Sequence, residues 1–304
     1  MIPNCPKVSP VLSTPTPFPP HHVVRKGFFR RKCDSRWIQR FWCKSCGAQF
    51  SRSTLSPRYR QKVRRINAPL SKHLASAGTL ARAALLLGVD PKTIARRACF
   101  LELQSIKSQK RYLESLPPNS IHAIQFDDLE TSIHTKCKPV SVAIAVEPKT
   151  RKILGFQVSE MPAKGLLAGV ARRKYGPRKD RRGRGWNALM RGLKPILSPD
   201  CEVTSDENPH YPKWVEKHFP KVKHIRVPGG RGAVTGQSEL RARGYDPMFA
   251  LNHTCAMLRA NINRLFRRTW STSKRMDRLA GHIAIYVDFH NRVLTPPYPA
   301  IGGS

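Results

Sequence analysis

Short apolar segments of two periodicities follow one another in a fixed order between the proline pair Pro117–Pro118 and residue 227. Segments 122–127, 139–146 and 152–158 have the length and residue types of strands, and the last two alternate with period two. Helical spacing then alternates with further strands, in the order helix 186–197, strand 201–205, helix 209–219 and strand 222–227. This order predicts an α/β layered domain.

The chain carries a large excess of positive charge. Its 304 residues include 55 lysines and arginines and 19 acids, which gives a net charge of +36. Such an excess repels itself unless a polyanion neutralises it, and nucleic acid is the natural partner because neutralised phosphates release counterions. A ribosomal-type or membrane-surface protein is the alternative that charge leaves open. No apolar run approaches the roughly 20 residues that span a bilayer, and no secretion signal begins the chain, so we expect a cytoplasmic protein.

A cysteine pair within the basic and aromatic segment 23–53 has the spacing of metal ligands. Cys43 and Cys46 are two residues apart and a glycine follows, so both thiolates can bind one tetrahedral metal ion from a tight turn. A zinc ribbon needs a second pair, and no second Cys-x-x-Cys precedes this one. The substitutes at non-standard spacing are Cys5, Cys33, His21 and His22. The pattern leaves two interpretations open, a zinc-ribbon-like element and a loop without metal.

Residues 58–116 have the pattern of a helix-turn-helix. Stretch 70–89 is rich in alanine and leucine at the spacing of one helix. After a turn, Asp90 and Pro91 are the residue types of an N-cap and a first helical position. The second helix would enter the major groove of DNA. Its candidate contacts are Thr93, Arg96 and Arg97. A helical hairpin packed on itself is the alternative.

Two aspartates stand out in a chain with few acids. Asp127 closes the first predicted strand of the α/β domain, and Asp206 closes the fourth. In this strand order the two ends can lie side by side, so that the carboxylates share divalent cations. Phosphodiester transfer favours a two-metal site with hard oxygen ligands, which suits Mg²⁺ or Mn²⁺. The alternative is that each aspartate only caps a helix or forms a turn.

Basic side chains concentrate in two further places. Segment 171–185 contains many lysines and arginines against one acid, which predicts a loop that is disordered or that DNA orders. A long basic helix is expected over 250–268 and another over 274–290. Cations there are expected to contact phosphates. They are Arg259, Arg264, Arg267, Arg268, Lys274 and Arg275.

Four phrases of the sequence together resemble one protein family. In chain order they are RFWCKSCGAQFSRST, IQFDDLETSIHTKCKPVSVAIAVE, VTSDENPHYPKWV and LNHTCAMLRANINRLFRRTWSTSKR. From Cys43 onward the chain is similar to bacterial insertion-sequence transposases of the DDE, ribonuclease-H-like superfamily. Within it, the chain resembles those related to the small two-frame insertion element of enteric bacteria.

The resemblance implies a zinc-ribbon-like element, a helix-turn-helix and a catalytic domain with a ribonuclease-H-like mixed sheet. The corresponding regions are 1–56, 57–116 and 117–295, with a tail at 296–304. It also implies a homo-oligomer on double-stranded DNA in the bacterial nucleoid. Such an enzyme cleaves strands at the element ends and joins the 3′ ends to target DNA. The implied metals are Mg²⁺ or Mn²⁺ for catalysis and Zn²⁺ for the ribbon.

Carried over by position, the family's first two catalytic acids fall on Asp127 and Asp206. The third should be a glutamate early on the final long helix, where this chain has Asn252. Asparagine offers one neutral carbonyl in place of a charged carboxylate, so metal affinity should fall. Related insertion-sequence families with asparagine at this position are known. Glu239 is the alternative third ligand, and Asp246 is a further acid that precedes the helix. The last alternative is that neither Asn252 nor Glu239 is the third ligand.

Three functional hypotheses follow. The first is an active transposase. The second is a catalytically impaired remnant that only binds DNA, because one cysteine pair and the glutamate are missing. The third is a basic DNA- or RNA-binding regulator that uses only the helix-turn-helix.

Overall fold

The computed structural model describes residues 2–7, 22–32, 34–228, 246–266 and 271–295. The chain divides into two compact units, Met1–Ile66 and Asn67–Ser304, called the first and the second unit below. None of the described helices has the length and apolar character needed to cross a membrane.

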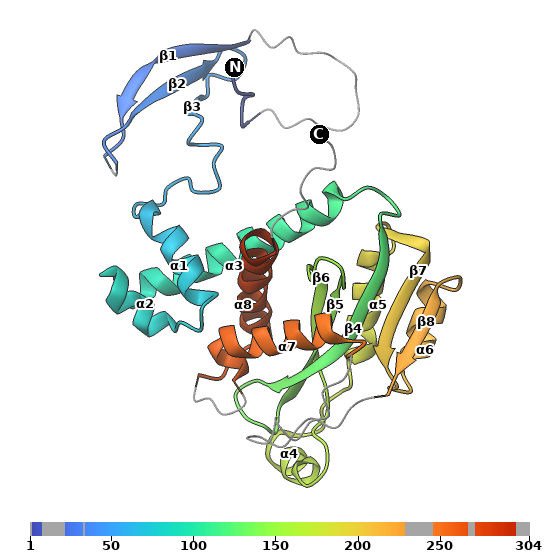
Figure 1. Cartoon of the computed structure of the whole chain (residues 1–304). Helices are drawn as coiled ribbons and strands as arrows, with labels where there is room; N and C mark the ends of the chain where they lie inside the picture. The colour runs from blue at the N-terminus through green and yellow to red at the C-terminus, as the bar shows by residue number, and fades with distance from the viewer. Residues whose placement is uncertain (1, 8–21, 33, 229–245, 267–270, 296–304) are drawn as a thin grey trace. The chain divides into compact units, whose positions relative to one another are not determined.

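The first unit is built on a small antiparallel sheet (Figure 1). Its strands are β1 (Val23–Arg30), β2 (Trp37–Cys43) and β3 (Gln49–Ser51), in that order across the sheet. β1 contains a bulge at Gly27, whose φ of 57° is a left-handed conformation that favours glycine. The rings of Phe41 and Phe50 lie 5.8 Å apart and form the core with a few neighbours. Domains with so small a core commonly gain stability from a metal or a disulfide.

The second unit begins with helices α1 (Asn67–Leu74), α2 (Leu80–Leu87) and α3 (Pro91–Ser115). The side chain of Asp90 accepts the backbone N–H of Lys92 at 2.8 Å, which confirms the predicted helix start. The prediction of one helix over 70–89 is wrong, because the chain leaves helical geometry between α1 and α2. Ala77 has a φ of 59° there, and Thr79 caps the new helix.

A five-stranded mixed sheet forms the centre of the second unit (Figure 1). Its strands are β4 (Ile121–Ser132), β5 (Pro139–Val146), β6 (Ile153–Glu160), β7 (Leu197–Asp206) and β8 (Lys223–Val227). The order across the sheet is β6-β5-β4-β7-β8. β4, β5 and β6 are antiparallel neighbours, whereas β7 is parallel to β4 and to β8. This mixed α/β architecture is compatible with the ribonuclease-H-like domain that the resemblance implies.

Helices cover both faces of this sheet (Figure 1). They are α5 (Arg182–Leu193), α6 (Tyr211–His218), α7 (Phe249–Asn261) and α8 (Met276–Phe289). A further helix, α4 (Leu167–Tyr175), lies between β6 and α5 in the chain. One apolar core joins the sheet to α7 and α8, and a second joins it to α5 and α6. Strand β5, which lies between β6 and β4, is therefore buried on both faces rather than on one.

Three segments of the second unit differ from the sequence predictions. β4 continues to Ser132, because its pairing with β5 extends over that length, so Asp127 lies inside the strand and not at its end. Segment 171–185 is not one loop, since α4 and α5 occupy most of it. The helix expected over 250–268 ends at Asn261, where Ile262 adopts extended geometry and a short 3-10 turn follows.

Candidate active site and cysteine cluster

Asp127 and Asp206 lie at the same level of two neighbouring parallel strands. β4 pairs with β7 as far as Gln125 opposite Thr204, and each aspartate follows two residues later on its strand. Asp206 is the last residue of β7, whereas β4 continues. The carboxyl ends of neighbouring strands are where open α/β sheets bind ligands. The structure thus brings together the two carboxylates that the sequence singled out.

The carboxyl group of Asp127 is mostly enclosed by protein. Burial raises its pKa to about 6, and the charge of Asp206 also raises it. Two donors oppose this change: the backbone N–H of Asp128 at 2.6 Å and the hydroxyl of Tyr211 at 2.9 Å both bond to Oδ1 of Asp127. A cation bound at this position would favour the charged carboxylate over the protonated acid.

Three aromatic rings support the two adjacent aspartates of β4. The centroids of Phe126, Trp186 and Tyr211 lie 5.0 to 5.1 Å apart in edge-to-face pairs. Tyr211 bonds to Asp127, and Trp186 Nε1 donates to Oδ2 of Asp128 at 3.2 Å. Neither aromatic donor is predictable from the local sequence pattern. The only signal was the presence of Tyr211 five residues after Asp206, which does not reveal where its hydroxyl lies.

Asp128 differs from Asp127 in its surroundings. Its carboxylate accepts hydrogen bonds from the Ser141 hydroxyl and from Trp186. Burial raises the pKa of Asp128, while these two donors lower it in part. Successive strand residues project to opposite faces of a sheet. Asp128 therefore projects to the opposite face of the sheet from Asp127, where side chains hold its carboxylate.

Asn252 lies near the start of α7 and is exposed. Cys255 follows it by three residues, on the same side of the helix. Burial raises the pKa of Cys255 to about 12, and the charge of Asp127 adds to this effect. The Asn252 amide donates to Oδ2 of Asp246 at 2.9 Å. Glu239, the alternative ligand, lies outside the described residues.

A buried glutamine fixes α7 to β4. The side chain of Gln125 donates to the carbonyl of Pro247 at 2.7 Å and accepts the backbone N–H of Leu251 at 3.0 Å. Both side-chain atoms thereby satisfy backbone groups at the beginning of the helix. The strand that carries Asp127 and the helix that carries Asn252 are joined by a direct contact.

The cations predicted to contact DNA have different environments. Arg96 and Lys274 are exposed, whereas Arg97 is buried and burial lowers its pKa. Burial also lowers the pKa of Arg264, which donates to the Ser273 hydroxyl at 3.0 Å. Thr93 and Arg259 are half-buried, and Arg275 pairs with Asp277 at 2.7 Å. The last two candidates, Arg267 and Arg268, lie outside the described residues. Arg96 and Lys274 are thus the most accessible of these candidates.

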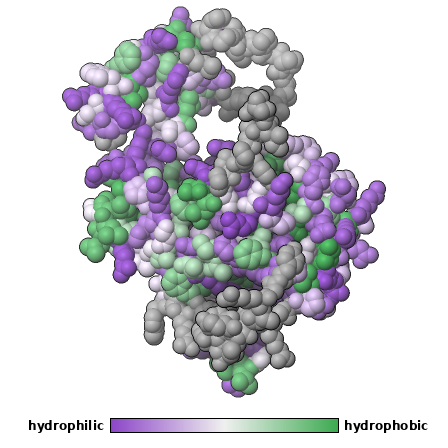
Figure 2. Space-filling view, in the orientation of Figure 1, coloured by the Kyte–Doolittle hydropathy of each residue, from purple (hydrophilic) through white to green (hydrophobic). Residues whose placement is uncertain are grey.

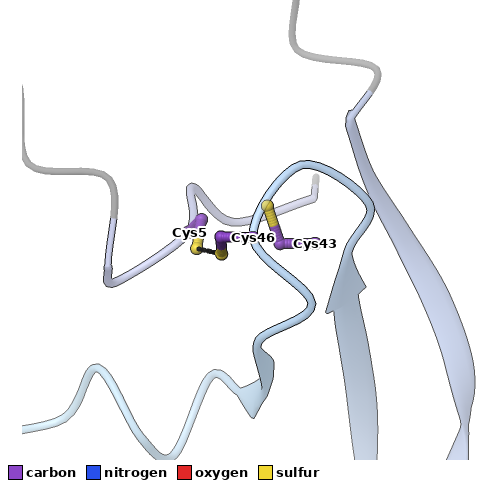
Figure 3. Close-up of side chains that lie close together, drawn as sticks. All are labelled: Cys5, Cys43 and Cys46. Atoms are coloured by element: carbon purple, nitrogen blue, oxygen red, sulfur yellow. Dashed lines mark hydrogen bonds between the residues drawn. The ribbon is translucent and has the colours of Figure 1, made fainter.

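Three cysteines gather in the first unit (Figure 3). Cys5 comes from the N-terminal segment, Cys43 is the last residue of β2, and Cys46 lies in the turn that follows. Their sulfur atoms all lie within 4.8 Å of one another. The Sγ atoms of Cys5 and Cys46 are 3.5 Å apart. A hydrogen bond from the backbone N–H of Cys46 lowers the pKa of Cys43 to about 7. Among the residues that the structure describes, this is the only group of three or more potential metal ligands.

The remaining zinc-ligand candidates are only partly described. Cys33 and His21 lie outside the described residues. His22 is exposed, and its Nδ1 lies 2.9 Å from the hydroxyl of Ser45, in the turn between the two ligands of the Cys-x-x-Cys pair. Gly47 closes this turn with a φ of 68°. The turn and Cys5 together supply three sulfur donors.

No family model matches the chain, and no curated protein matches it. Among solved structures, it is similar to a chain of a simian T-cell lymphotropic virus intasome, determined by cryoEM in complex with PP2A regulatory subunit B56 gamma. The sequence identity is 14%, the match covers 79% of this chain and 77% of that chain, and the TM-score is 0.24. A TM-score this low reflects little overall superposition.

Proposed function

We propose that this protein is a DNA transposase that cleaves the ends of an insertion sequence and transfers the strands to target DNA. The observation that carries the proposal is the position of Asp127 and Asp206 on adjacent parallel strands, at the point where β7 ends. The net charge of +36 supports a nucleic-acid partner. Joining two element ends requires that both be held at once, which favours a homo-oligomer on double-stranded DNA.

The donor set suits a hard divalent cation. Two carboxylates and the amide oxygen of Asn252 are oxygen ligands of the type that Mg²⁺ and Mn²⁺ prefer. When bound, such ions would activate the attacking hydroxyl and stabilise the leaving oxygen of the phosphodiester. Tyr211 holds Asp127 in position through its hydrogen bond, and Gln125 holds the helix that carries Asn252. Exposed cations, including Arg96 and Lys274, would bind the DNA backbone.

The test is strand nicking by the purified full-length protein. The substrate is a labelled duplex that carries the inverted repeats flanking the gene, incubated with Mn²⁺ or with EDTA. We expect nicks at the repeat ends in Mn²⁺ only. Tight duplex binding without nicking in any divalent cation would support the alternative, a remnant that only binds DNA. The observation that favours this alternative is the neutral Asn252, whose amide already bonds to Asp246.

The Asn252→Ala variant is expected to nick about 10 to 100 times more slowly, because a group that completes or orients a metal site commonly contributes this much. Asn252→Glu should retain activity and need less Mn²⁺. Asn261→Ala, at the other end of α7, is the matched control and should nick at the wild-type rate. If Asn252→Ala keeps full activity while Glu239→Ala loses it, the third ligand is Glu239.

We further propose that the first unit binds one zinc ion through Cys5, Cys43 and Cys46. Sulfur donors are typical of structural zinc, and such a site normally has four ligands. His22 or Cys33 would complete it. Elemental analysis of the full-length protein should give one zinc per chain, and Cys43→Ser should lose it. Cys201→Ser, buried in the second unit, is the control and should keep the metal. A folded, zinc-free wild-type protein would contradict this proposal.

A further inference from the structure

The first unit contains a second feature besides its cysteines, a pocket of about 420 Å³. It lies between the three-stranded sheet and the segment 53–64, and none of the three clustered cysteines lines it. Its cations are Arg31, Lys32, Arg40, Arg60, Lys62 and Arg64. No acid is among the residues described as lining it. Figure 2 shows hydrophilic side chains over much of the visible face of this unit.

Hydrogen bonds hold two of these cations in fixed positions. Arg31 and Arg64 both donate to the hydroxyl of Ser53, at 2.9 and 3.3 Å. Arg31 also pairs with Asp34, which offsets one of the six charges. The pocket therefore keeps a clear positive excess, and the guanidinium groups of Arg31 and Arg64 lose little conformational freedom when an anion binds.

Aromatic rings lie among these cations. Phe29 and Tyr59 both line the pocket, and Tyr59 is 47% exposed. The guanidinium of Arg60 lies 5.6 Å from the centre of the Tyr59 ring. Rings beside cations are the combination by which proteins bind single-stranded nucleic acid, since a base stacks on the ring while the phosphate meets the charge.

We propose that this pocket binds an unpaired nucleotide of single-stranded DNA. Its volume is within the roughly 300–1,000 Å³ of sites that enclose a small organic group. A duplex keeps its bases stacked inside and offers only its backbone, so it would contact the cations at the rim and leave the rings unused. A nucleotide with an extruded or unpaired base can use both features of the pocket, because its base stacks on a ring and its phosphate meets the cations. The inference concerns binding only, and does not require the cleavage proposed above.

The experiment measures the binding of the full-length protein to a labelled single strand of twenty thymidines and to a duplex of equal length, by fluorescence anisotropy. Tyr59→Ala should weaken single-strand binding about 10-fold and leave duplex binding unchanged. Tyr59→Phe, which keeps the ring, should bind normally. Lys62→Gln should weaken single-strand binding and reduce its salt dependence by about 0.7 in the log–log slope.

Matched variants separate the pocket from general surface effects. Trp37→Ala removes a more exposed ring, at 69%, from the same sheet but outside the pocket, and Lys221→Gln removes a charge from the second unit. Neither should weaken single-strand binding. The proposal would be overturned by any of three results. Tyr59→Ala and Trp37→Ala could lose the same affinity for the single strand, Tyr59→Ala could lose as much affinity for the duplex as for the single strand, or the wild type could bind a uridine strand more tightly than the thymidine strand. Asp206→Asn should bind the single strand normally, so failure of cleavage and failure of this inference are distinguishable.

Discussion

The Asp206→Asn variant is expected to nick DNA roughly 1,000 times more slowly than the wild type, because several kcal/mol of transition-state stabilisation depend on a charged metal ligand. The fold should survive the change. Oδ1 of Asp206 accepts the backbone N–H of Asn208 at 3.0 Å, and the asparagine carbonyl can accept the same bond. Affinity for duplex DNA should stay the same or increase slightly, since one negative charge is removed from a surface that meets phosphates.

Glu202→Gln is the matched control for this prediction. Glu202 lies on the same strand, β7, is exposed and pairs with Lys223 at 3.4 Å, which is a surface ion pair of small energetic value. It should nick at the wild-type rate. Nicking by Asp206→Asn above a tenth of the wild-type rate would show that Asp206 is not a metal ligand, and the proposed site would have to be abandoned.

Asp127→Asn is expected to stabilise the metal-free protein at neutral pH while it removes activity. Burial raises the pKa of Asp127 from an ordinary 3.8 to about 6. A carboxyl with a raised pKa contributes its full stability below the unfolded-state pKa and loses it as the pH rises through 6. The cost of ionisation at pH 7.5 is about 3 kcal/mol, from about 1.4 kcal/mol per pKa unit, and asparagine avoids it. The melting temperature in EDTA should rise by roughly 6–12 °C.

The same comparison of melting temperatures at pH 4 is the control for this prediction. At pH 4 the wild-type carboxyl is protonated in the folded state, so the advantage of Asp127→Asn should nearly vanish. The other groups around Asp127 are Asp128, Asp206, Tyr211 and Cys255, and none is altered in this variant. Asp200→Asn, on an exposed part of β7, should not stabilise the protein at either pH. Equal stability of Asp127→Asn and wild type at pH 7.5 would contradict the buried environment.

Mn²⁺ should change the melting temperatures of the wild type and of Asp127→Asn by different amounts. The ion favours the charged carboxylate, so it should raise the melting temperature of the wild type and have a much smaller effect on Asp127→Asn.

The sequence predicts the order of the five strands of the sheet and of the helices α5 and α6, because these elements have the spacing or residue types of strands and helices. It does not predict α4, and it merges α1 and α2 into one helix. It predicts the ends of the elements less well. The consecutive acids Asp127 and Asp128 indicate the end of a strand, since acids are poor strand formers. Yet β4 passes through them, because Ser141 and Trp186 hydrogen-bond to Asp128. Such contacts come from residues distant in sequence, and no local pattern contains them.

The prediction of a loop over 171–185 was wrong for a related reason. The many cations of this segment indicate exposure to solvent, but a helix with exposed cations is as well solvated as a loop, so charge does not determine the backbone geometry. For the site, the predicted strand ends and the resemblance both indicated Asp127 and Asp206, and the pairing of β4 with β7 explains why the two residues meet. The hydroxyl of Tyr211 and the amide of Gln125 were not foreseen, because both act through side-chain direction. The gathering of Cys5 with the Cys-x-x-Cys pair depends on a contact across 38 positions or more, from Cys5 to Cys43.

The two bonds of Gln125 have a consequence for the chain that precedes α7. Since this glutamine fixes the start of α7 directly to β4, the spacing of Asn252 from Asp127 does not depend on the length of chain between β8 and α7. Residues could be inserted or deleted between 229 and 245 without displacing the helix. A change in length between 229 and 245 should therefore leave the start of α7 in place as long as Gln125 keeps both bonds.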